Sequence, residues 1–361
     1  MKRDDARHTH AQASRIGLLL INLGTPDEPT PAALRRYLGQ FLSDPRVIEI
    51  PMALWKPLLH GIILRVRPAK SAAKYASIWM PEGSPLRVWT ERQTKLLTGY
   101  LGERGRPLLV RHAMRYGNPS IESQMQALVD DGATRVLVLP LYPQYSAATT
   151  ATALDRVFAW ARQARRVPEL RTINHFHDDA DYIDALASSI SAYWMKHGRP
   201  DKLLMSFHGM PRRTLTLGDP YFCECQKTAR LLAARLSLKP EQWVITFQSR
   251  FGRAEWLQPY TEPTLRELGK AGCGRVDVVC PGFVADCIET LEEIAMEGRE
   301  AFLESGGKDF HYIPCLNDDP RGMAALTRLV ERHLQGWEPA PEDAAALQVR
   351  QERARRLGAA Q

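Results

Sequence analysis

The sequence predicts a doubly wound α/β fold made of two similar halves. Short apolar runs alternate along the chain with longer amphipathic stretches, and one strand-and-turn segment occurs twice. The runs predicted to be strands lie at 16–22, 108–113, 135–141, 171–174, 203–207, 244–248, 276–280 and 312–315. Segments with helical spacing lie between them, as at 121–131, 182–197, 226–236 and 261–271. Continuous apolar strands separated by helices indicate parallel sheets that are covered on both faces.

The repeated segment indicates that the two halves are related. Residues 18–26 read LLLINLGTP, residues 203–211 read LLMSFHGMP, and four of the nine positions are identical. Each segment is a predicted buried strand that runs into a Gly-x-Pro turn. Ligands bind beyond the carboxyl ends of the strands in such sheets, so both turns are expected to border a cleft between the halves. Leu23 has the position in the first segment that His208 has in the second.

Composition restricts the classes of protein to be considered. The 361 residues are 44% hydrophobic and 25% charged, which is typical of a globular protein of two domains. A net charge of +7 suits an acidic small molecule or an anionic membrane surface. The sequence contains no nucleic-acid-binding signature, so no nucleic-acid partner is expected. The first 15 residues lack the apolar core of a secretory signal and are predicted to be a disordered arm of a cytoplasmic protein.

The six cysteines all follow residue 220 and are too sparse for a disulfide scaffold. The pair Cys223-x-Cys225 also has the wrong spacing for a zinc ribbon. Reduced, mostly buried thiols are therefore expected.

His208 is the first candidate for a chemical role. It directly follows a predicted buried strand, so its side chain is placed to project into the expected cleft. A histidine at such a position can be a base, a metal ligand or a core residue, because its imidazole titrates near neutral pH.

Three carboxylates form a second candidate. Glu289, Glu293 and Glu297 are spaced by four residues in a helix expected to begin near Asp286. On one α-helix they would form a stripe that is destabilised by like-charge repulsion, with nothing local to offset it. A stripe that faces a cleft could pass protons or divalent cations in steps. Three alternatives stay open: Asp286 and Glu289 form a capping box at a helix start, the helix dipole favours an acid near the N-terminus, or the stripe is a solvated face.

A third motif, His175-x-His177-Asp178-Asp179, contains residue types that bind metals. The simpler interpretation is that Asp178 or Asp179 caps the helix that starts near residue 182.

The apolar stretch 55–64 is followed by Arg65, Arg67 and Lys70. It is either an ordinary amphipathic helix or a lip that touches a membrane or the ligand.

Eight segments, taken together and in order, resemble the ferrochelatases. They are LLLINLGTP (18–26), GSPL (83–86), MRYGNPS (114–120), YPQYSAATT (142–150), SFHGMP (206–211), GDPY (218–221), TFQSRFGRAEWLQP (246–259) and CPGFVADCIETLEEI (280–294). The resemblance implies two Rossmann-like domains around a porphyrin cleft. It also implies an enzyme of haem biosynthesis that inserts Fe²⁺, its substrate, into protoporphyrin IX to give protohaem and two protons.

The resemblance also assigns residues. His208 and Glu289 match the catalytic metal-site pair of the family, and Glu293 and Glu297 match the acidic ladder that relays protons or metal. Residues that match positions around the macrocycle are Leu23, Arg115, Tyr116, Tyr145, Trp256 and Phe283. The family arrangement places 16–140 with a returning 318–361 in the first domain, and 141–317 in a second domain that carries the metal site.

Three departures from family members refine this expectation. No cysteine follows Cys315, and Ala147 stands where some members place another cluster ligand, so no [2Fe–2S] cluster is expected. No nucleotide cofactor is implied either. Leu23 stands where members that use coproporphyrin have tyrosine, which favours protoporphyrin IX. Cys287 replaces a histidine found in some members, and is either a tuning residue or a buried thiol.

Several alternatives stay open at this point. The chain could be a chelatase for another tetrapyrrole or another metal such as cobalt, or a non-catalytic tetrapyrrole carrier, which would need no acidic ladder. His208 could accept protons or deliver the metal. The base role is favoured because the adjoining carboxylates can accept the protons from it. The sequence identifies no Fe²⁺ donor, and peripheral contact with the inner face of the membrane is an open alternative.

Overall fold

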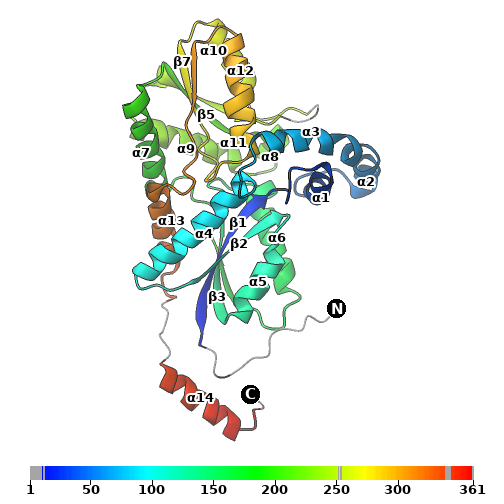
Figure 1. The fold of residues 1–361 in the computed structure, drawn as a ribbon, viewed down its shortest axis with the longest axis vertical. Coiled ribbons are helices and arrows are strands. Elements are labelled where there is room, and N and C mark those ends of the chain that lie inside the picture. The colour runs from blue at the N-terminus through cyan, green and yellow to red at the C-terminus, as the bar shows by residue number, and fades with distance from the viewer. Residues whose placement is uncertain (1–9, 11–12, 251, 253, 338–342, 360–361) are drawn as a thin grey trace.

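The computed structural model describes residues 10, 13–250, 252, 254–337 and 343–359. Figure 1 shows two sheets stacked along the long axis of the molecule, with helices around each and α14 set apart at one end. Of the predicted arm, residues 1–9 and 11–12 lie outside the described part of the chain.

The two sheets have the same topology. Each has four parallel strands, in the orders β2-β1-β3-β4 and β6-β5-β7-β8. The strands are β1 (Arg15–Gly24), β2 (Leu109–Tyr116), β3 (Ala133–Pro140), β4 (Glu169–Thr172), β5 (Lys202–His208), β6 (Trp243–Gln248), β7 (Arg275–Val279) and β8 (Asp309–Tyr312). The segments of the sequence repeat form β1 and β5, which occupy equivalent places. The predicted doubly wound fold of two similar halves is confirmed.

Strand β1 is apolar without alternation because both of its faces are covered. Leu18 and Leu20 belong to one core with α4, whereas Leu19 and Ile21 belong to another with α5 and α6. These three helices are α4 (Pro85–Glu103), α5 (Ile121–Asp130) and α6 (Thr152–Ala161).

The second sheet is covered in the same way. Leu203 and Met205 pack with α7 and α9, and Leu204 packs on the other face with α10 and α12. The helices are α7 (Ala180–His197), α9 (Tyr221–Arg235), α10 (Thr261–Lys270) and α12 (Arg299–Glu304). Burial of alternate side chains on opposite faces explains why these strands read as continuous apolar runs.

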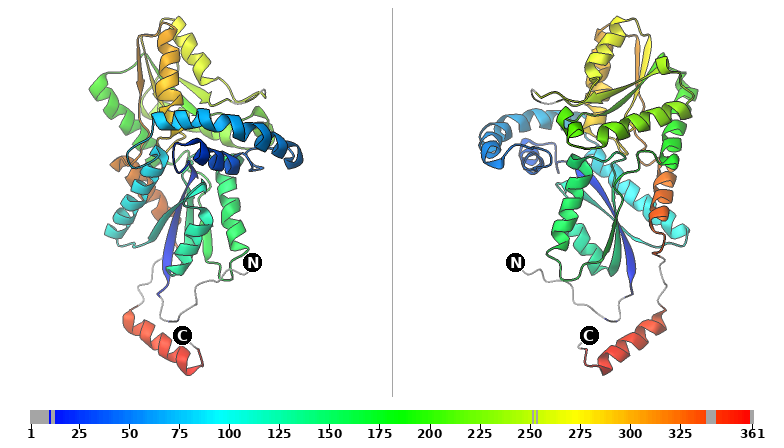
Figure 2. Two further views of the ribbon diagram at one scale, coloured as in Figure 1. Left: turned by 45° about the vertical axis from the view of Figure 1, so that its right-hand side comes forward. Right: turned by 180° about the vertical axis from the view of Figure 1, so that it is seen from behind.

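A group of helices projects beside the junction of the two halves (Figures 1 and 2). It consists of α1 (Pro31–Phe41), α2 (Met52–Leu58), the π-helix η1 (Leu59–Ile63) and α3 (Leu64–Ser77). We call residues 52–77 the lip. The remaining short elements are η2 (Ala147–Ala151), α8 (Arg212–Thr216), η3 (Pro240–Gln242), α11 (Ile288–Leu291) and η4 (Glu293–Gly298).

The C-terminal part contains two separate helices. Helix α13 (Pro320–His333) packs against both α7 and α4, so it joins the two halves. Helix α14 (Ala344–Arg356) lies away from both sheets in all views (Figures 1 and 2). Among the described residues, no helix combines the length and the apolar character that crossing a membrane requires.

The strands expected at 171–174 and 312–315 lie two and three residues earlier, as β4 and β8. Both are edge strands, and they begin with the exposed residues Glu169 and Asp309. Polar residues are common on edge strands, so an apolar run locates such strands imperfectly. Since β4 pairs with β3, the first sheet extends to Thr172, beyond the boundary expected after residue 140.

Candidate active site

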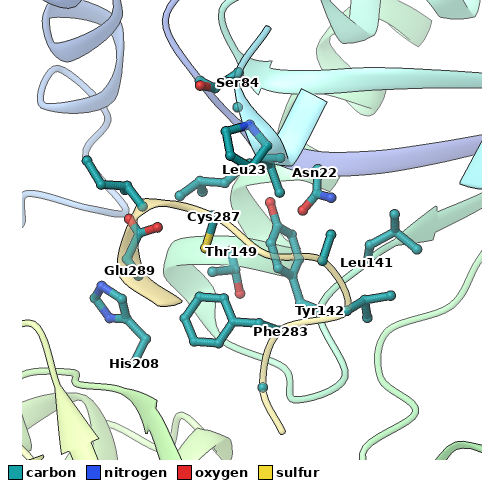
Figure 3. Close-up of a pocket in the computed structure, with 18 of the residues that line it drawn as sticks. Asn22, Leu23, Ser84, Leu141, Tyr142, Thr149, His208, Phe283, Cys287 and Glu289 are labelled. Atoms are coloured by element: carbon teal, nitrogen blue, oxygen red, sulfur yellow. The ribbon is translucent and has the colours of Figure 1, made fainter. Parts of the chain in front are cut away.

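A cleft lies between the two halves at the carboxyl ends of β1 and β5 (Figure 3). It encloses about 840 Å³ of space, part of it open to solvent. A volume of this size is typical of small-molecule sites, which are about 300–1,000 Å³. The first half contributes Asn22, Leu23, Gly24, Thr25, Tyr75, Ile78, Ser84, Pro85, Leu86, Leu141, Tyr142, Gln144 and Thr149, and the second His208, Tyr221, Gly282, Phe283, Val284, Ala285, Cys287, Ile288 and Glu289.

The two glycines of the sequence repeat permit the tight turns at this cleft. Gly24 has a φ of 116°, and a Cβ there would lie 1.8 Å from the carbonyl oxygen of Tyr116. A Cβ on Gly209 would lie 2.5 Å from the carbonyl oxygen of Gln248. Both turns therefore require glycine, because a neighbouring backbone passes where a side chain would be.

His208 is the last residue of β5 and is partly buried. Its Nδ1 lies 2.7 Å from the carbonyl oxygen of Gly209, and its own carbonyl accepts a hydrogen bond from the Tyr221 hydroxyl at 2.9 Å. In the neutral imidazole, Nδ1–H is the donor to the Gly209 carbonyl. The lone pair is then on Nε2, which can accept a proton or bind a metal.

Glu289 comes from α11, on a different segment of the second half. Its backbone carbonyl accepts a hydrogen bond from Gln248 Nε2 at 2.6 Å, which ties α11 to the end of β6. Figure 3 shows the carboxylate of Glu289 and the imidazole of His208 directed toward one another at the edge of the cleft. The predicted pair is therefore brought together by the fold.

The prediction of one regular helix from Asp286 onward is wrong. The chain forms the four-residue α11, then the π-helix η4, then α12. The capping interpretation of Glu289 is also wrong. Cys287 is the N-cap and accepts from the backbone of Thr290, whose hydroxyl accepts from the Cys287 N–H at 3.0 Å. Asp286 instead accepts from Thr290 and from the Tyr312 hydroxyl. Hence the cap does not explain an acid at 289.

The other two carboxylates have different partners. Glu293 accepts hydrogen bonds from the backbone N–H of Ser249 at 2.6 Å and from its hydroxyl at 2.5 Å. Glu297 is about half exposed and is paired with Lys74 of the lip at 2.7 Å. Glu293 and Glu297 both lie in η4, and π-helical turns are frequent at functional sites.

Burial and like charge perturb these acids. Burial, with the charge of Glu289 adding to it, raises the pKa of Glu293, while hydrogen bonds from Ser249 and the charge of His208 act against this. Burial also raises the pKa of Glu292, which Lys74 opposes from 2.9 Å. Part of the repulsion is offset from a distant segment, because Lys74 of the first half pairs with Glu292 and Glu297.

Two of the six residues expected around a macrocycle, Leu23 and Phe283, line the cleft. Arg115 and Tyr116 are not among the described residues that line it. Both bind the buried carboxylate of Asp44, Arg115 through its guanidinium and Tyr116 through its hydroxyl at 2.9 Å. The Arg115 Nε also donates to Thr152.

Tyr145 and Trp256 are likewise outside the described lining of the cleft. The backbone N–H of Tyr145 donates to Glu224 at 2.7 Å. Trp256 packs next to Gly209, 3.2 Å from the position that a Cβ would take there. A porphyrin-contacting role for these four residues stays a prediction.

The cleft also contains residues to which sequence reasoning assigned no individual role. Tyr75 of α3 is buried, and burial together with the charge of Glu289 raises its pKa well above the usual range. The hydroxyl of Tyr142 is buried and has no hydrogen-bond partner among the described residues, so it can donate to a ligand. Ser84 and Thr149 fall within segments quoted for the resemblance, whereas no sequence signal identified Tyr75.

Cys287 is buried in the cleft wall. Burial, followed by the charge of Glu289, raises the pKa of its thiol well above the usual range. It is therefore a neutral thiol beside the metal-site candidates.

The fold resembles that of a solved sirohydrochlorin chelatase. The solved structure of SirB from Bacillus subtilis with Fe³⁺ superposes with a TM-score of 0.51 at 12% identity, covering 90% of this chain and 98% of that one. At that identity the likeness shows the fold alone.

Sequence comparison identifies the family. The Ferrochelatase family model matches residues 15–334. The ferrochelatase of Methylibium petroleiphilum is 67% identical over 354 residues, covering 98% of this chain and 97% of the relative. That of a Polaromonas species is 61% identical over 350 residues, covering 97% and 95%. The chain belongs to the ferrochelatase family, as the eight sequence segments predicted.

Proposed function

We propose that the protein inserts Fe²⁺ into protoporphyrin IX, giving protohaem and two protons. Family membership over nearly the whole chain supports this reaction. The observation that carries it is the convergence of His208 and Glu289 in one cleft between the two halves. An imidazole and a carboxylate are suitable both as ligands of Fe²⁺ and as acceptors of the pyrrole protons.

In the proposed mechanism His208 and Glu289 are the catalytic residues. The Nδ1–H of His208 is held by the Gly209 carbonyl, so Nε2 is the basic atom. Nε2 accepts one pyrrole proton and Glu289 supplies negative charge and a second acceptor. The metal then replaces the two protons on the four nitrogens, so charge is conserved.

Glu293 and Glu297 act as the relay in this proposal. The raised pKa of Glu293, caused chiefly by burial, brings it closer to neutral pH, where a carboxyl exchanges protons efficiently. Glu297 reaches solvent and is paired with Lys74 at the outer end of the relay. This ion pair must open when a proton or a metal ion passes Glu297.

The experiment is anaerobic incubation of the protein with a panel of divalent metals and porphyrins, followed by loss of porphyrin fluorescence. We expect the highest kcat/KM for Fe²⁺ with protoporphyrin IX. Tight haem binding with no insertion of any metal would support the carrier instead, and a preference for cobalt would make the chain a different chelatase.

Substrate choice is proposed to favour protoporphyrin IX over coproporphyrin III. Leu23 lines the cleft and offers no hydroxyl to a ligand. Leu23→Tyr should shift the ratio of specificity constants toward coproporphyrin III. A wild-type preference for coproporphyrin III would overturn this proposal without affecting iron insertion.

We propose that the protein holds no [2Fe–2S] cluster. The support is the sequence after Cys315, which contains no cysteine. The anaerobically purified protein should lack the visible absorption and paramagnetic resonance of such a cluster, and a stoichiometric signal would contradict this.

A cytoplasmic protein that touches the membrane through the lip is our proposal for localisation. Leu54, Leu58, Ile62 and Val66 are exposed at four-residue intervals along the lip, next to exposed Arg65, Arg67 and Lys70. Apolar and basic side chains side by side suit an anionic interface. Co-sedimentation with anionic vesicles should fall in Leu54→Ser/Ile62→Ser, and equal sedimentation of the variant would contradict the proposal.

The division into domains is proposed to follow the two sheets. The first domain would hold β1–β4, the second would carry the metal site, and the segment after residue 318 would return to the first domain through contacts of α13 with α4. Limited proteolysis should cut between the sheets, in the segments after β4 or before α13. Cutting inside either sheet would contradict the division.

A further inference from the structure

A second group of metal-binding residue types lies beside the cleft. His175 and His177 come from the loop that follows β4, and Glu224 comes from the first turns of α9. One ligand atom from each residue lies within 4.8 Å of the others, and no other such group occurs among the described residues. None of the three lines the cleft that contains His208.

The aspartates of the sequence motif have other roles. Asp179 is the N-cap of α7 and accepts from the backbone N–H of Tyr182 at 3.1 Å, as the simpler interpretation predicted. Asp178 is paired with Lys227 at 2.5 Å. The two histidines are left to face Glu224, which is distant in sequence and was not considered with them.

Of the two contacts that join the histidines to Glu224, only that of His175 is a hydrogen bond. His175 Nδ1 lies 2.6 Å from Glu224 Oε1, and His177 Nδ1 lies 3.3 Å from Glu224 Oε2. His177 is 6% exposed, and its Nδ1 makes no hydrogen bond of ordinary geometry with any described residue. Leaving a buried polar atom unsatisfied is destabilising, so its orientation toward a carboxylate points to a ligand between them.

The backbone around the group is fixed. The hydroxyl of Thr228 donates to the His177 carbonyl at 2.8 Å, and the backbone N–H of Phe176 donates to the Pro143 carbonyl at 2.9 Å. Glu224 itself is 6% exposed and accepts from the Tyr145 N–H. The site is thus built from three segments that already hold one another.

We propose that His175, His177 and Glu224 bind a divalent transition-metal ion of the Zn²⁺, Fe²⁺ or Co²⁺ type. Two imidazoles and one carboxylate are a common ligand set for such ions. The side chain of His175 is half exposed, which leaves an entry path and room for a water molecule as the fourth ligand. Ligand atoms around tetrahedral zinc are about 3.3 Å apart, as follows from bonds of about 2.0–2.1 Å, so small side-chain rotations suffice.

Binding at this site has a structural consequence. Glu224 bonds to Tyr145, and Gln144, which lines the cleft, donates to Thr228 on the same helix at 2.9 Å. A metal held by Glu224 therefore fastens the loop that contains Tyr145 to α9 and to the loop after β4. This proposal does not depend on the proposed function, since it involves none of the catalytic residues.

The test is Co²⁺ binding to the full chain, measured by visible absorption and by metal content after gel filtration. The background is His208→Ala, which removes the proposed catalytic ligand and with it signals from the cleft. This protein should still bind one Co²⁺ with the absorption of a site of low coordination number, and Zn²⁺ should displace it.

Two variants made in this background decide the outcome. His177→Ala should abolish the cobalt signal. Glu224→Gln should do the same, although the amide oxygen can still accept from Tyr145 and so preserve the fold. The matched control is His60→Ala, which removes an exposed histidine of the lip and should leave binding unchanged.

Absence of cobalt binding in the His208→Ala protein would overturn the proposal, as would binding that survives both His177→Ala and Glu224→Gln. Neither result would bear on iron insertion by the wild-type protein. That reaction fails or succeeds separately.

Discussion

The contact of Ser249 with Glu293 allows a quantitative test of the acidic relay. The Ser249 hydroxyl donates to Glu293 at 2.5 Å, and this bond stabilises the ionised form of the carboxyl. A hydrogen bond to a charged group contributes about 1.5–3 kcal/mol. Ser249→Ala should therefore raise the pKa of Glu293 further, because the ionised carboxyl loses this stabilisation. If the ionised Glu293 accepts protons from His208 or Glu289, the acid limb of the kcat profile should move to higher pH by an amount set by this free energy.

The assay is initial-rate kinetics across the pH range with a matched pair of variants. Ser249 has a φ of 65°, so Ser249→Gly also removes the hydroxyl but relaxes the backbone. Both variants should show the same shift of the acid limb, while Ser249→Gly is the more stable of the two. Glu293→Gln should lose that limb and turn over slowly while still binding porphyrin. An unmoved limb in both Ser249 variants, together with normal turnover in Glu293→Gln, would refute the relay.

Three further predictions follow from other contacts. Lys74→Ala should lower the KM for Fe²⁺, because a competing cation leaves Glu292 and Glu297, and an unchanged KM at low salt would contradict this. In urea unfolding it should cost at most about 1 kcal/mol for the half-exposed pair with Glu297, and more for the pair with the buried Glu292. Asp44→Asn should destabilise the protein by about 3–5 kcal/mol in the same assay, because it leaves the Arg115 charge unpaired in a buried site. Burial opposes ionisation of Asp44, but hydrogen bonds and Arg115 outweigh it and lower the pKa of this carboxyl. The stability that ionised Asp44 contributes should therefore be present above the ordinary carboxyl pKa near 4 and be lost as pH falls through the lowered pKa. An Asp44→Asn protein as stable as wild type would show that the network is dispensable. Gly209→Ala should reduce both turnover and stability, because the new Cβ meets the Gln248 carbonyl and displaces the neighbouring His208; normal kinetics would disprove the steric argument.

Much of this fold could be predicted because parallel strands covered on both faces read as continuous apolar runs. Strand β1 is the clear case, since its successive leucines belong to opposite cores. The repeat of a strand and a Gly-x-Pro turn also located the cleft, because Gly24 and Gly209 are required by close backbone approaches. Edge strands β4 and β8 were placed imprecisely because polar residues at a sheet edge face solvent.

The site was predictable where a single motif carries it and less so where distant segments meet. His208 ends a strand and Glu289 lies in the first turn of a helix, so both are visible in local sequence. Local spacing could not reveal that a π-helix follows α11, because both helix types use the same residues. It also could not reveal that Lys74 pairs with Glu297, 223 residues away, or that Glu224 faces the histidine motif.

The central claim is that His208 performs the chemistry of iron insertion. The most direct measurement is anaerobic turnover of Fe²⁺ and protoporphyrin IX by His208→Ala, alongside porphyrin binding and thermal unfolding of the same variant. Because His208 ends a strand and its side chain bonds only to the Gly209 carbonyl among the contacts described, the fold and porphyrin binding should be retained while loss of porphyrin fluorescence stops. A His208→Ala protein that turns over at the wild-type rate would contradict the account.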